Sequence, residues 1–265
     1  APDQAVALAR LLIEAGGRHL DDASPIVDVR LAPGIRVHAA LAPVALGGAT
    51  ISVRFSRSRH VDFLDLPVDW QPGQQQQLIS AVHNRATILI TGNTGSGKTT
   101  LLASLLARSA ARDRIVVLED VAELDIDHPH VVQLECRQAN LEGVGEIGLD
   151  RLVRESLRMR PTRLVVGECR GVELRELLAA FTSGHRGGAS TIHAPHLASV
   201  PARLEALGVL AHYSPKQLAR QVVHAFDLII HISVGDEGRR QVELGRFVVG
   251  ENGTLAVDTD SSAEK

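Results

Sequence analysis

Residues 92–100 are the segment of this sequence that most restricts its fold. They read Gly-Asn-Thr-Gly-Ser-Gly-Lys-Thr-Thr and follow directly after the apolar run 88–90. The segment fits Gly-x-x-x-x-Gly-Lys-Ser/Thr, in which a strand ends in a glycine-rich turn whose backbone N–H groups surround phosphates. Leucines at 101, 102, 105 and 106 then recur at helical spacing. Because strand, loop and helix come in the required order, we favour a nucleotide site over a glycine-rich turn beside an incidental lysine.

The expected roles follow from the chemistry of the pattern. Lys98 reaches the outer phosphates as a point charge, and the hydroxyl of Thr99 is a ligand for Mg²⁺. We therefore expect ATP and Mg²⁺ as cofactors. The predicted nucleotide-binding residues of the loop are Gly92, Asn93, Thr94, Gly95, Ser96, Gly97, Lys98, Thr99 and Thr100.

Composition narrows the choice of function. The 265 residues, 45% of them hydrophobic, can bury one large core or two smaller ones. A net charge of -3 and 3% aromatic residues do not indicate a basic surface with stacking platforms, so no nucleic-acid partner is expected. Cys136 and Cys169 lack metal-ligand spacing and are expected to be reduced. We find no signal peptide or membrane span and expect a cytoplasmic protein.

The first part of the chain predicts a small α+β domain over residues 1–66. A helix is expected at 4–13, a hairpin at 26–31 and 35–41, and a strand at 49–55. In that last strand Ile51, Val53 and Phe55 are expected to point inward and Arg54 outward. Because the chain starts at Ala1, we expect the native N-terminus to extend further.

A Pro- and Gly-containing segment at 67–75 predicts a linker, and residues 76–265 predict an α/β domain. Apolar runs at 115–118, 131–134 and 164–166 are typical of parallel strands buried on both faces. Helices are expected near 78–83, 149–158, 172–181, 198–207 and 215–225. A hairpin of 228–234 and 241–249, with its turn at 236–238, is expected at the sheet edge, followed by a frayed polar tail at 258–265.

Acidic side chains follow two of these strands. Glu119, Asp120 and Glu123 come after the strand at 115–118, and Glu168 comes after 164–166. Ligands of open α/β sheets bind beyond the carboxyl ends of the strands, so these acids are expected near the phosphates. An acid in the position of Glu168 can hold Mg²⁺ or its water. The alternative for the first three is a solvated acidic turn.

The stretch 184–194 is a glycine-rich turn that leads into a short strand. It carries His185 at one edge and His193 at the other. Most histidines are surface or hydrogen-bonded residues, and we assign no role to His38, His60, His128 and His212. On physical grounds alone, the roles of His185 and His193 stay open.

Four segments together resemble the secretion ATPase superfamily, the motors of type II and type IV secretion and of type IV pili. They are GNTGSGKTT, LEDVAEL, LRMRPTRLVVGECRG and SGHRGGASTIHA. The resemblance covers about 26–232, and the segment at 27–55 resembles the branch that serves tight-adherence (Flp) pili. It implies a RecA-like P-loop NTPase core and a PAS-like N-terminal domain. The tetracysteine motif of other branches is absent from the sequence, which argues against structural zinc.

The resemblance also implies roles for individual residues. Glu119, Asp120 and Glu123 match an acidic box, with Glu123 as the general base. Glu168 matches the Walker B acid, with Thr99 as the other metal ligand, and Arg170 is the arginine that follows it. His185, Thr191 and His193 match a histidine box that senses the nucleotide. Arg36 and Arg54 match arginines that bring positive charge to the nucleotide, although alternation alone makes Arg54 an ordinary solvated strand residue.

The function that the resemblance implies is an ATP-hydrolysing ring motor, a homo-oligomer of six subunits. Its expected partner is an inner-membrane platform protein of a pilus or secretion system, which would hold it at the inner face of the cytoplasmic membrane. Two alternatives stay open. One is a nucleic-acid translocase on the same fold, and the other is a binding module that uses ATP only to hold a conformation.

Overall fold

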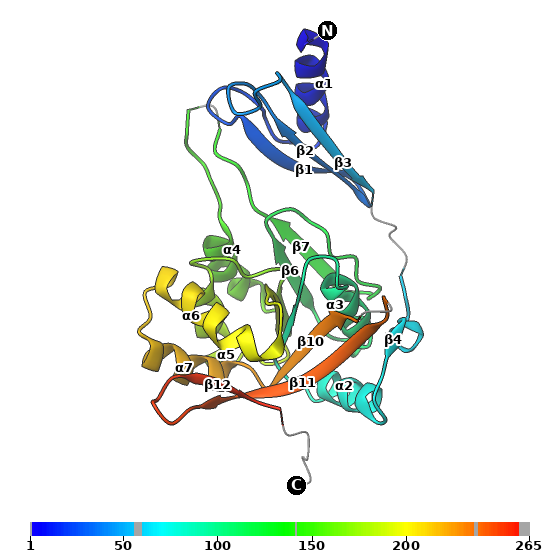
Figure 1. Cartoon of the computed structure of the whole chain (residues 1–265), viewed down its shortest axis with the longest axis vertical. Coiled ribbons are helices and arrows are strands. Elements are labelled where there is room, and N and C mark those ends of the chain that lie inside the picture. The colour runs from blue at the N-terminus through cyan, green and yellow to red at the C-terminus, as the bar shows by residue number, and fades with distance from the viewer. Residues whose placement is uncertain (1, 56–59, 141, 236–237, 260–265) are drawn as a thin grey trace. The chain divides into compact units, whose positions relative to one another are not determined.

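The computed structural model describes residues 2–55, 60–140, 142–235 and 238–259 (Figure 1). Contacts divide the chain into two compact units. The first unit contains Ala1–Arg59 together with Asp120–Glu123 and Glu135–Ile147, and the second contains His60–Glu119, Leu124–Leu134 and Gly148–Lys265. Each unit has a hydrophobic core of its own.

The first unit packs one helix on an antiparallel sheet. Helix α1 (Pro2–Ala15) precedes strands β1 (Ile26–Ala32), β2 (Ile35–Ala40) and β3 (Thr50–Phe55), which pair in the order β1-β2-β3. Ala9 and Ile13 of the helix are fully buried against Val29 and Val37 of the sheet. The helix and the three strands expected from the sequence are confirmed.

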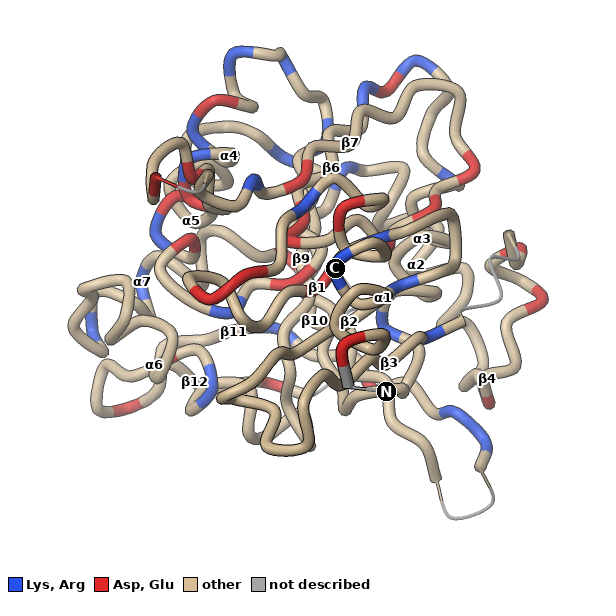
Figure 2. Tube along the Cα trace, turned by 90° about the horizontal axis from the view of Figure 1, so that it is seen from above, with Lys and Arg blue, Asp and Glu red and all other residues tan. Residues whose placement is uncertain are grey.

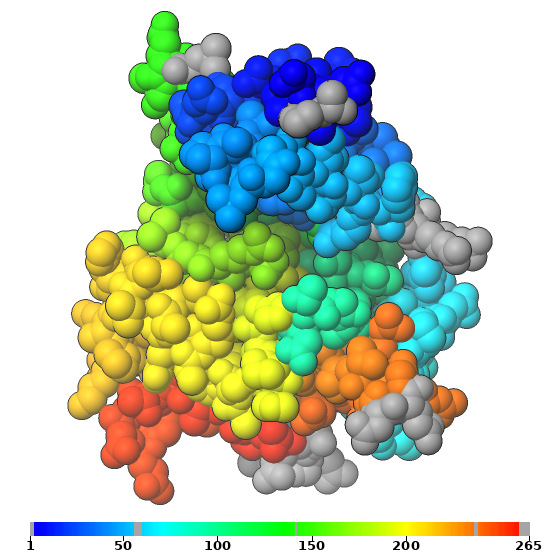
Figure 3. Space-filling view, turned by 45° about the horizontal axis from the view of Figure 1, so that its top comes forward, coloured from blue at the N-terminus to red at the C-terminus, as the bar shows by residue number. Residues whose placement is uncertain are grey.

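The side chains of Val53 and Phe55 were predicted to point inward, into the core. The structure shows that neither side chain is buried. Val53 is 43% exposed and Phe55 is 74% exposed. The register Val37↔Val53 does place them on the same face as buried residues of β2. Among the β3 residues, however, only Ile51 packs against the core under α1. The far end of this edge strand, light blue in Figure 3, therefore leaves its apolar side chains at the surface.

The second unit is built on a single large sheet. In the described residues it has nine strands, in the order β12-β11-β10-β5-β9-β8-β6-β7, with β4 paired to β11. Strands β10, β5, β9, β8 and β6 are parallel, whereas β11 runs antiparallel to β10. The strands are β4 (Val68–Asp69), β5 (Ile88–Gly92), β6 (Ile115–Glu119), β7 (Val131–Glu135), β8 (Arg163–Val166), β9 (Ala189–His193), β10 (Leu228–Val234), β11 (Arg240–Val249) and β12 (Leu255–Asp258).

Helices cover both faces of this sheet (Figure 1). Helices α2 (Gln74–His83) and α3 (Lys98–Leu106) share a core with Ile88, Ile90 and Ile230 on one face. The remaining helices are α4 (Leu149–Ser156), α5 (Leu174–Thr182), α6 (Val200–Leu210) and α7 (Pro215–Ala225), with short 3-10 turns at Phe63–Asp65, Leu157–Met159 and Leu197–Ser199. The predicted α/β class with a parallel sheet is confirmed. None of the helices in the described ranges combines the length and apolar character that a membrane crossing requires.

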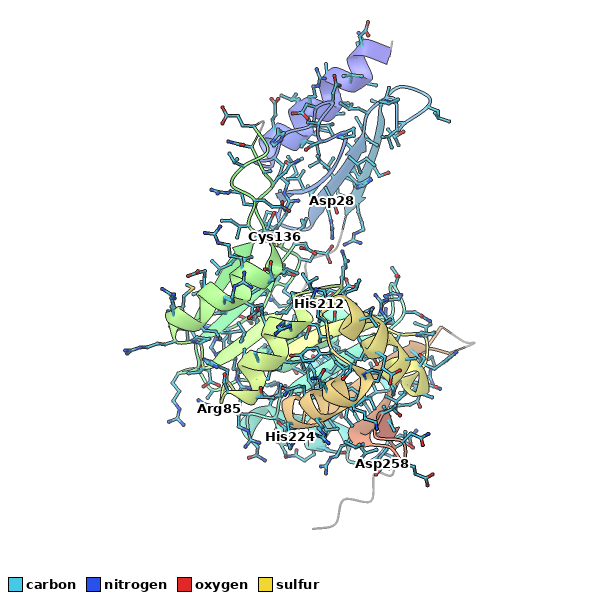
Figure 4. The ribbon with its side chains drawn as sticks, turned by 90° about the vertical axis from the view of Figure 1, so that its left-hand side faces the viewer. Asp28, Arg85, Cys136, His212, His224 and Asp258 are labelled. Carbon is cyan, nitrogen blue, oxygen red and sulfur yellow. The ribbon has the colours of Figure 1, made fainter. Side chains whose placement is uncertain are left out.

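The hairpin of β10 and β11 is not at the edge of the sheet, contrary to the prediction. Strands β12 and β4 both pair with β11 and cover it. Strand β12 was missed because it is only four residues long and ends at Asp258, labelled in Figure 4, where a polar tail was expected. Residues 236–237 of the predicted turn and 260–265 of the predicted tail lie outside the described residues.

A buried ion pair fixes the amino ends of two strands that carry candidate site residues at their other ends. At the start of β8, the Nε of Arg163 donates to Asp113 over 2.7 Å, and its terminal nitrogens donate to the carbonyls of Val82 and Gly187. Arg85, labelled in Figure 4, donates to the other carboxylate oxygen of Asp113. Burial alone would raise the pKa of Asp113, but the bonds from Arg163 and Arg85 outweigh it and lower that pKa. These bonds therefore hold the amino ends of β8 and β9 in place.

Candidate functional site

The glycine-rich loop leaves the carboxyl end of β5, a strand whose residues are all buried. Gly92, Gly95 and Gly97 have φ angles of 153°, 76° and 103°, which residues with a side chain rarely adopt. A Cβ atom on Gly92 would lie 2.2 Å from the carbonyl oxygen of Ile232 on the neighbouring strand β10. The loop thus needs glycine both for its conformation and for its close packing on β10.

The loop residues fit a phosphate group. Ser96 is buried, and within the described residues its hydroxyl oxygen has no hydrogen-bond partner. Gly97 ends the loop, and α3 begins at Lys98, so the helix N-terminus faces the same place. Asn93, Thr94, Gly95, Thr99 and Thr100 are exposed. The loop therefore offers backbone N–H groups and hydroxyls to a ligand from solvent.

The Lys98 side chain folds back over this loop. Its Nζ donates to the carbonyls of Gly92 over 2.9 Å and Asn93 over 2.8 Å. Burial lowers the pKa of Lys98, the charge of Glu168 opposes that shift, and the charge of Arg170 adds to it. Lys98, Glu168 and Arg170 therefore belong to one electrostatic cluster.

Glu168 follows β8 at the carboxyl edge of the sheet, as predicted. Arg170 donates to its carboxylate over 2.6 Å. Glu173 holds the turn between them and α5, because its carboxylate accepts the backbone N–H groups of Arg170 and Gly171. In the ranges that the structure describes, no cluster of three or more His, Cys, Asp or Glu side chains could hold a metal alone. A Mg²⁺ ion that is shared with phosphates needs only one or two protein ligands, and Thr99 and Glu168 fit that need.

Glu119 ends β6 and is 6% exposed. Its carboxylate oxygens accept the backbone N–H of Leu124 at 3.1 and 3.3 Å. A Cβ atom on Gly167 would lie 2.7 Å from its Cγ, so the side chain packs directly against the residue before Glu168. Glu119 thus supports both the acidic turn and the end of β8.

The two histidines of the glycine-rich stretch lie at opposite ends of β9. His193 pairs with Gly92 in the sheet, and its Nε2 lies 3.2 Å from the backbone nitrogen of Thr94. Thr191 donates to the carbonyl of Gly167 over 2.7 Å, which ties β9 to the end of β8. His185 precedes β9 and lies 3.3 Å from the carbonyl of Ala180 at the end of α5. The structure therefore brings His193 to the loop and does not bring His185 there.

A second cluster lies in the first unit. Arg36 of β2 and Arg54 of β3 are paired in the sheet, and both donate to the carboxylate of Glu123. Arg36 also donates to Asp28 of β1, labelled in Figure 4. Burial alone would lower the pKa of Arg36, but its bond to Asp28 and the charge of Glu123 outweigh that and raise it. The predicted general base and both predicted arginines thus form one ionic cluster.

Asp120 belongs to the same unit. Its backbone carbonyl accepts a hydrogen bond from Arg18 over 2.6 Å, and its carboxylate lies 3.4 Å from the sulfur of Cys136. Burial and then the charge of Asp120 raise the pKa of the Cys136 thiol to about 12, so this cysteine is an unreactive thiol.

Three residues that contact site segments were not predicted from the sequence. Glu173 holds the turn after Glu168, as described above. His231 of β10 lies with its Nδ1 2.8 Å from the hydroxyl of Thr91, and Arg240 of β11 donates to the carbonyl of Ser96 over 2.9 Å. A signal was present for Arg240, because alternation puts it on the same face of its strand as the buried Val242.

His231 and Thr91 are both buried, and they face each other where β5 enters the loop. Burial lowers the pKa of His231 from its ordinary 6.5. The charge of Glu243, its partner on β11, opposes this shift, and the charges of His196 and Lys98 add to it. The folded protein therefore favours the neutral imidazole. This stabilisation is complete above pH 6.5 and is lost as the pH falls below that value toward the folded pKa.

We predict that the wild-type protein loses more thermal stability than His231→Asn from about pH 7.5 to about pH 5.5, because asparagine does not titrate. Thermal unfolding at several pH values measures this. His224→Asn, which changes an exposed histidine of α7 (Figure 4), is the control and should follow the wild type. Parallel curves for the wild type and His231→Asn would contradict the prediction.

Known proteins resemble this chain over most of its length. The family model described as "Type II/IV secretion system protein" matches residues 6–236. The putative conjugal transfer protein Rv3659c of Mycobacterium tuberculosis (strain H37Rv) is 44% identical over 243 residues, which cover 89% of this chain and 69% of that protein. The conjugal transfer protein TrbB of Rhizobium radiobacter is 34% identical over 230 residues, which cover 84% and 68%.

The fold is shared with solved secretion ATPases. The VirB11 ATPase from the Brucella suis type IV secretion system, solved in complex with sulphate, matches with a TM-score of 0.58 and 23% identity. The match covers 92% of this chain and 83% of that one. At this identity the match shows the fold alone. The family match over residues 6–236 leads to one conclusion: the chain belongs to the type II/IV secretion system protein family.

Proposed function

We propose that the chain is a subunit of an ATP-hydrolysing motor that works as a homo-oligomeric ring, with six subunits. The observation that carries the proposal is the phosphate loop, with three glycines at positive φ, a buried serine hydroxyl without a partner in the described residues, and Lys98 above it. We assign the motor to a type IV pilus, most specifically a tight-adherence (Flp) pilus, or to a related secretion system. Its partner is an inner-membrane platform protein, through which it sits at the cytoplasmic face of the membrane.

The residues divide the chemistry between them. The backbone N–H groups of the loop and the Lys98 ammonium hold and neutralise the phosphates. Thr99 and Glu168 would hold a magnesium ion, which would supply positive charge to the phosphates. Arg170 keeps the Glu168 carboxylate in place. His193, through its contact with Thr94, links the occupancy of the loop to the end of β9.

We assign the hydrolytic step to Glu123, which takes a proton from the attacking water. Arg36 and Arg54 stabilise the charge that develops on the transferred phosphoryl group, in their own chain or a neighbouring one. In the present state both arginines are ion-paired with the Glu123 carboxylate. Catalysis thus requires the arginines to exchange the Glu123 carboxylate for phosphate oxygens, and that exchange is the event that couples hydrolysis to movement.

A second candidate is a nucleic-acid translocase on the same fold. It is favoured by the names of two relatives, which are conjugal transfer proteins. The charge pattern disfavours it, because the net charge is -3 and basic and acidic stretches are interspersed along the trace (Figure 2). Measuring ATPase activity with and without DNA separates the two candidates, since only a translocase should be stimulated.

We predict that Glu123→Gln binds ATP but hydrolyses it at least about 10²-fold more slowly, because the amide keeps the shape and loses the basicity. Lys98→Ala should lose both binding and hydrolysis. Phosphate release and nucleotide binding, measured on the same samples, distinguish the two variants. Glu142→Gln, an exposed carboxylate of the same unit, is the control for Glu123. If Glu119→Gln traps ATP while Glu123→Gln turns over normally, Glu119 is the base instead.

A mixing experiment tests whether subunits share a site. Arg36→Ala,Arg54→Ala protein and Lys98→Ala protein should each be inactive, for complementary reasons. Rings that contain both would include interfaces that join an intact loop to intact arginines, so mixing should restore activity. An arginine at the transferred phosphate is worth about 10³-fold in rate, so sparse competent interfaces are detectable. Verified mixed rings without recovery would mean that the arginines do not serve a neighbour.

A further inference from the structure

The hairpin of β10 and β11 lies beside the phosphate loop, because β10 pairs with β5, the strand from which the loop leaves. Arg240 makes the most specific contact, with its Nε donating to the backbone carbonyl of Ser96 over 2.9 Å. Its stem lies against Gly97, where a Cβ atom would be 3.0 Å from the same Nε. On the other strand, the Ile232 carbonyl excludes any side chain at Gly92. The hairpin therefore requires glycine at position 92, and at position 97 it packs the Arg240 side chain closely against the loop.

The geometry of the peptide bond gives the Arg240 contact a consequence. In a trans peptide the C=O group and the following N–H group point in opposite directions. A donor that holds the Ser96 carbonyl therefore fixes the direction of the Gly97 N–H, on the opposite side of the same peptide plane. In a phosphate loop such N–H groups contact the phosphates. Arg240 thus acts on the ligand side of the loop while it touches only the back.

The charge of the guanidinium adds to this effect. A hydrogen bond from a charged donor is stronger than one from a neutral donor, and it polarises the peptide so that its N–H becomes a better donor. Within the described residues, no carboxylate forms an ion pair with Arg240, whereas its neighbour Arg239 pairs with Asp69 over 3.3 Å. The charge of Arg240 is therefore directed at the loop.

We propose that Arg240 is a positioning residue of the nucleotide site, which sets the Ser96–Gly97 peptide for phosphate binding from within the same chain. The inference rests on the proposed nucleotide binding by the loop. It adds a residue that lies 140 positions after Thr100, the last residue of the loop motif. It also assigns a role to the β10–β11 hairpin, which supports the loop through Arg240, Ile232 and His231.

Equilibrium binding of MgADP to the full chain tests the proposal. Arg240→Met keeps the apolar stem beside Gly97 and removes the charged donor, so affinity should fall about 10-fold or more. Arg240→Lys keeps the charge and a donor and should recover part of that loss. Arg239→Met removes an exposed surface ion pair and is the matched control, expected to bind as the wild type does. Thermal unfolding without nucleotide should be the same for all four proteins.

Three results would overturn the proposal. Wild-type affinity in Arg240→Met would show that the contact does not set the loop. A loss of affinity that accompanies a lowered melting temperature, and that Arg240→Lys does not reduce, would show a general structural role. If the wild-type protein does not bind MgADP, the proposed function is overturned and this inference with it. This result can be told apart from the first, because there the wild type binds MgADP and here it does not.

Discussion

The close packing of the phosphate loop between its neighbouring strands is the constraint on which the candidate site depends. Gly92 can pass the carbonyl of Ile232 only because it lacks a side chain, and the loop behind it turns through positive φ angles at Gly95 and Gly97. His193 from β9 and Arg240 from β11 then contact the loop from either side. Strand pairing within the one sheet holds all of these contacts, so the loop is shaped before a ligand arrives.

The ionic cluster of the first unit is distinct from the phosphate loop of the second unit. Glu123 accepts hydrogen bonds from Arg36 and Arg54, which the sheet register places side by side. An arginine that acts on a phosphate and a carboxylate that acts on water are both unsuitable for those tasks while they are paired with each other. We propose that this pairing is a resting state of the motor, which ends when the arginines exchange the carboxylate for a nucleotide phosphate.

Local patterns in the sequence were sufficient for most of the fold. The motif at 92–100, the apolar runs of β6 and β8, and the helical spacing of α7 predicted their elements because each pattern depends on neighbouring residues. Three features depended on distant partners and were missed. Strand β12 forms because it pairs with β11. Val53 and Phe55 are exposed, whereas Ile51 of the same strand packs against the core under α1. Sheet pairing brings Arg240 to the loop and His231 to Thr91, the residue before it. His185 precedes β9 and so lies at its amino end, away from the loop. That β9 runs parallel to β5 depends on pairing between distant segments and not on the residues next to His185.

We propose that residues 92–100 are a preformed cradle for the phosphates of a nucleotide. The decisive experiment is hydrogen exchange of the backbone amides, measured with and without MgADP. MgADP should slow exchange most strongly within 92–100, because those N–H groups become donors to the phosphates. If the protein binds MgADP while exchange in 92–100 stays unchanged and slows elsewhere, the loop is not the phosphate site.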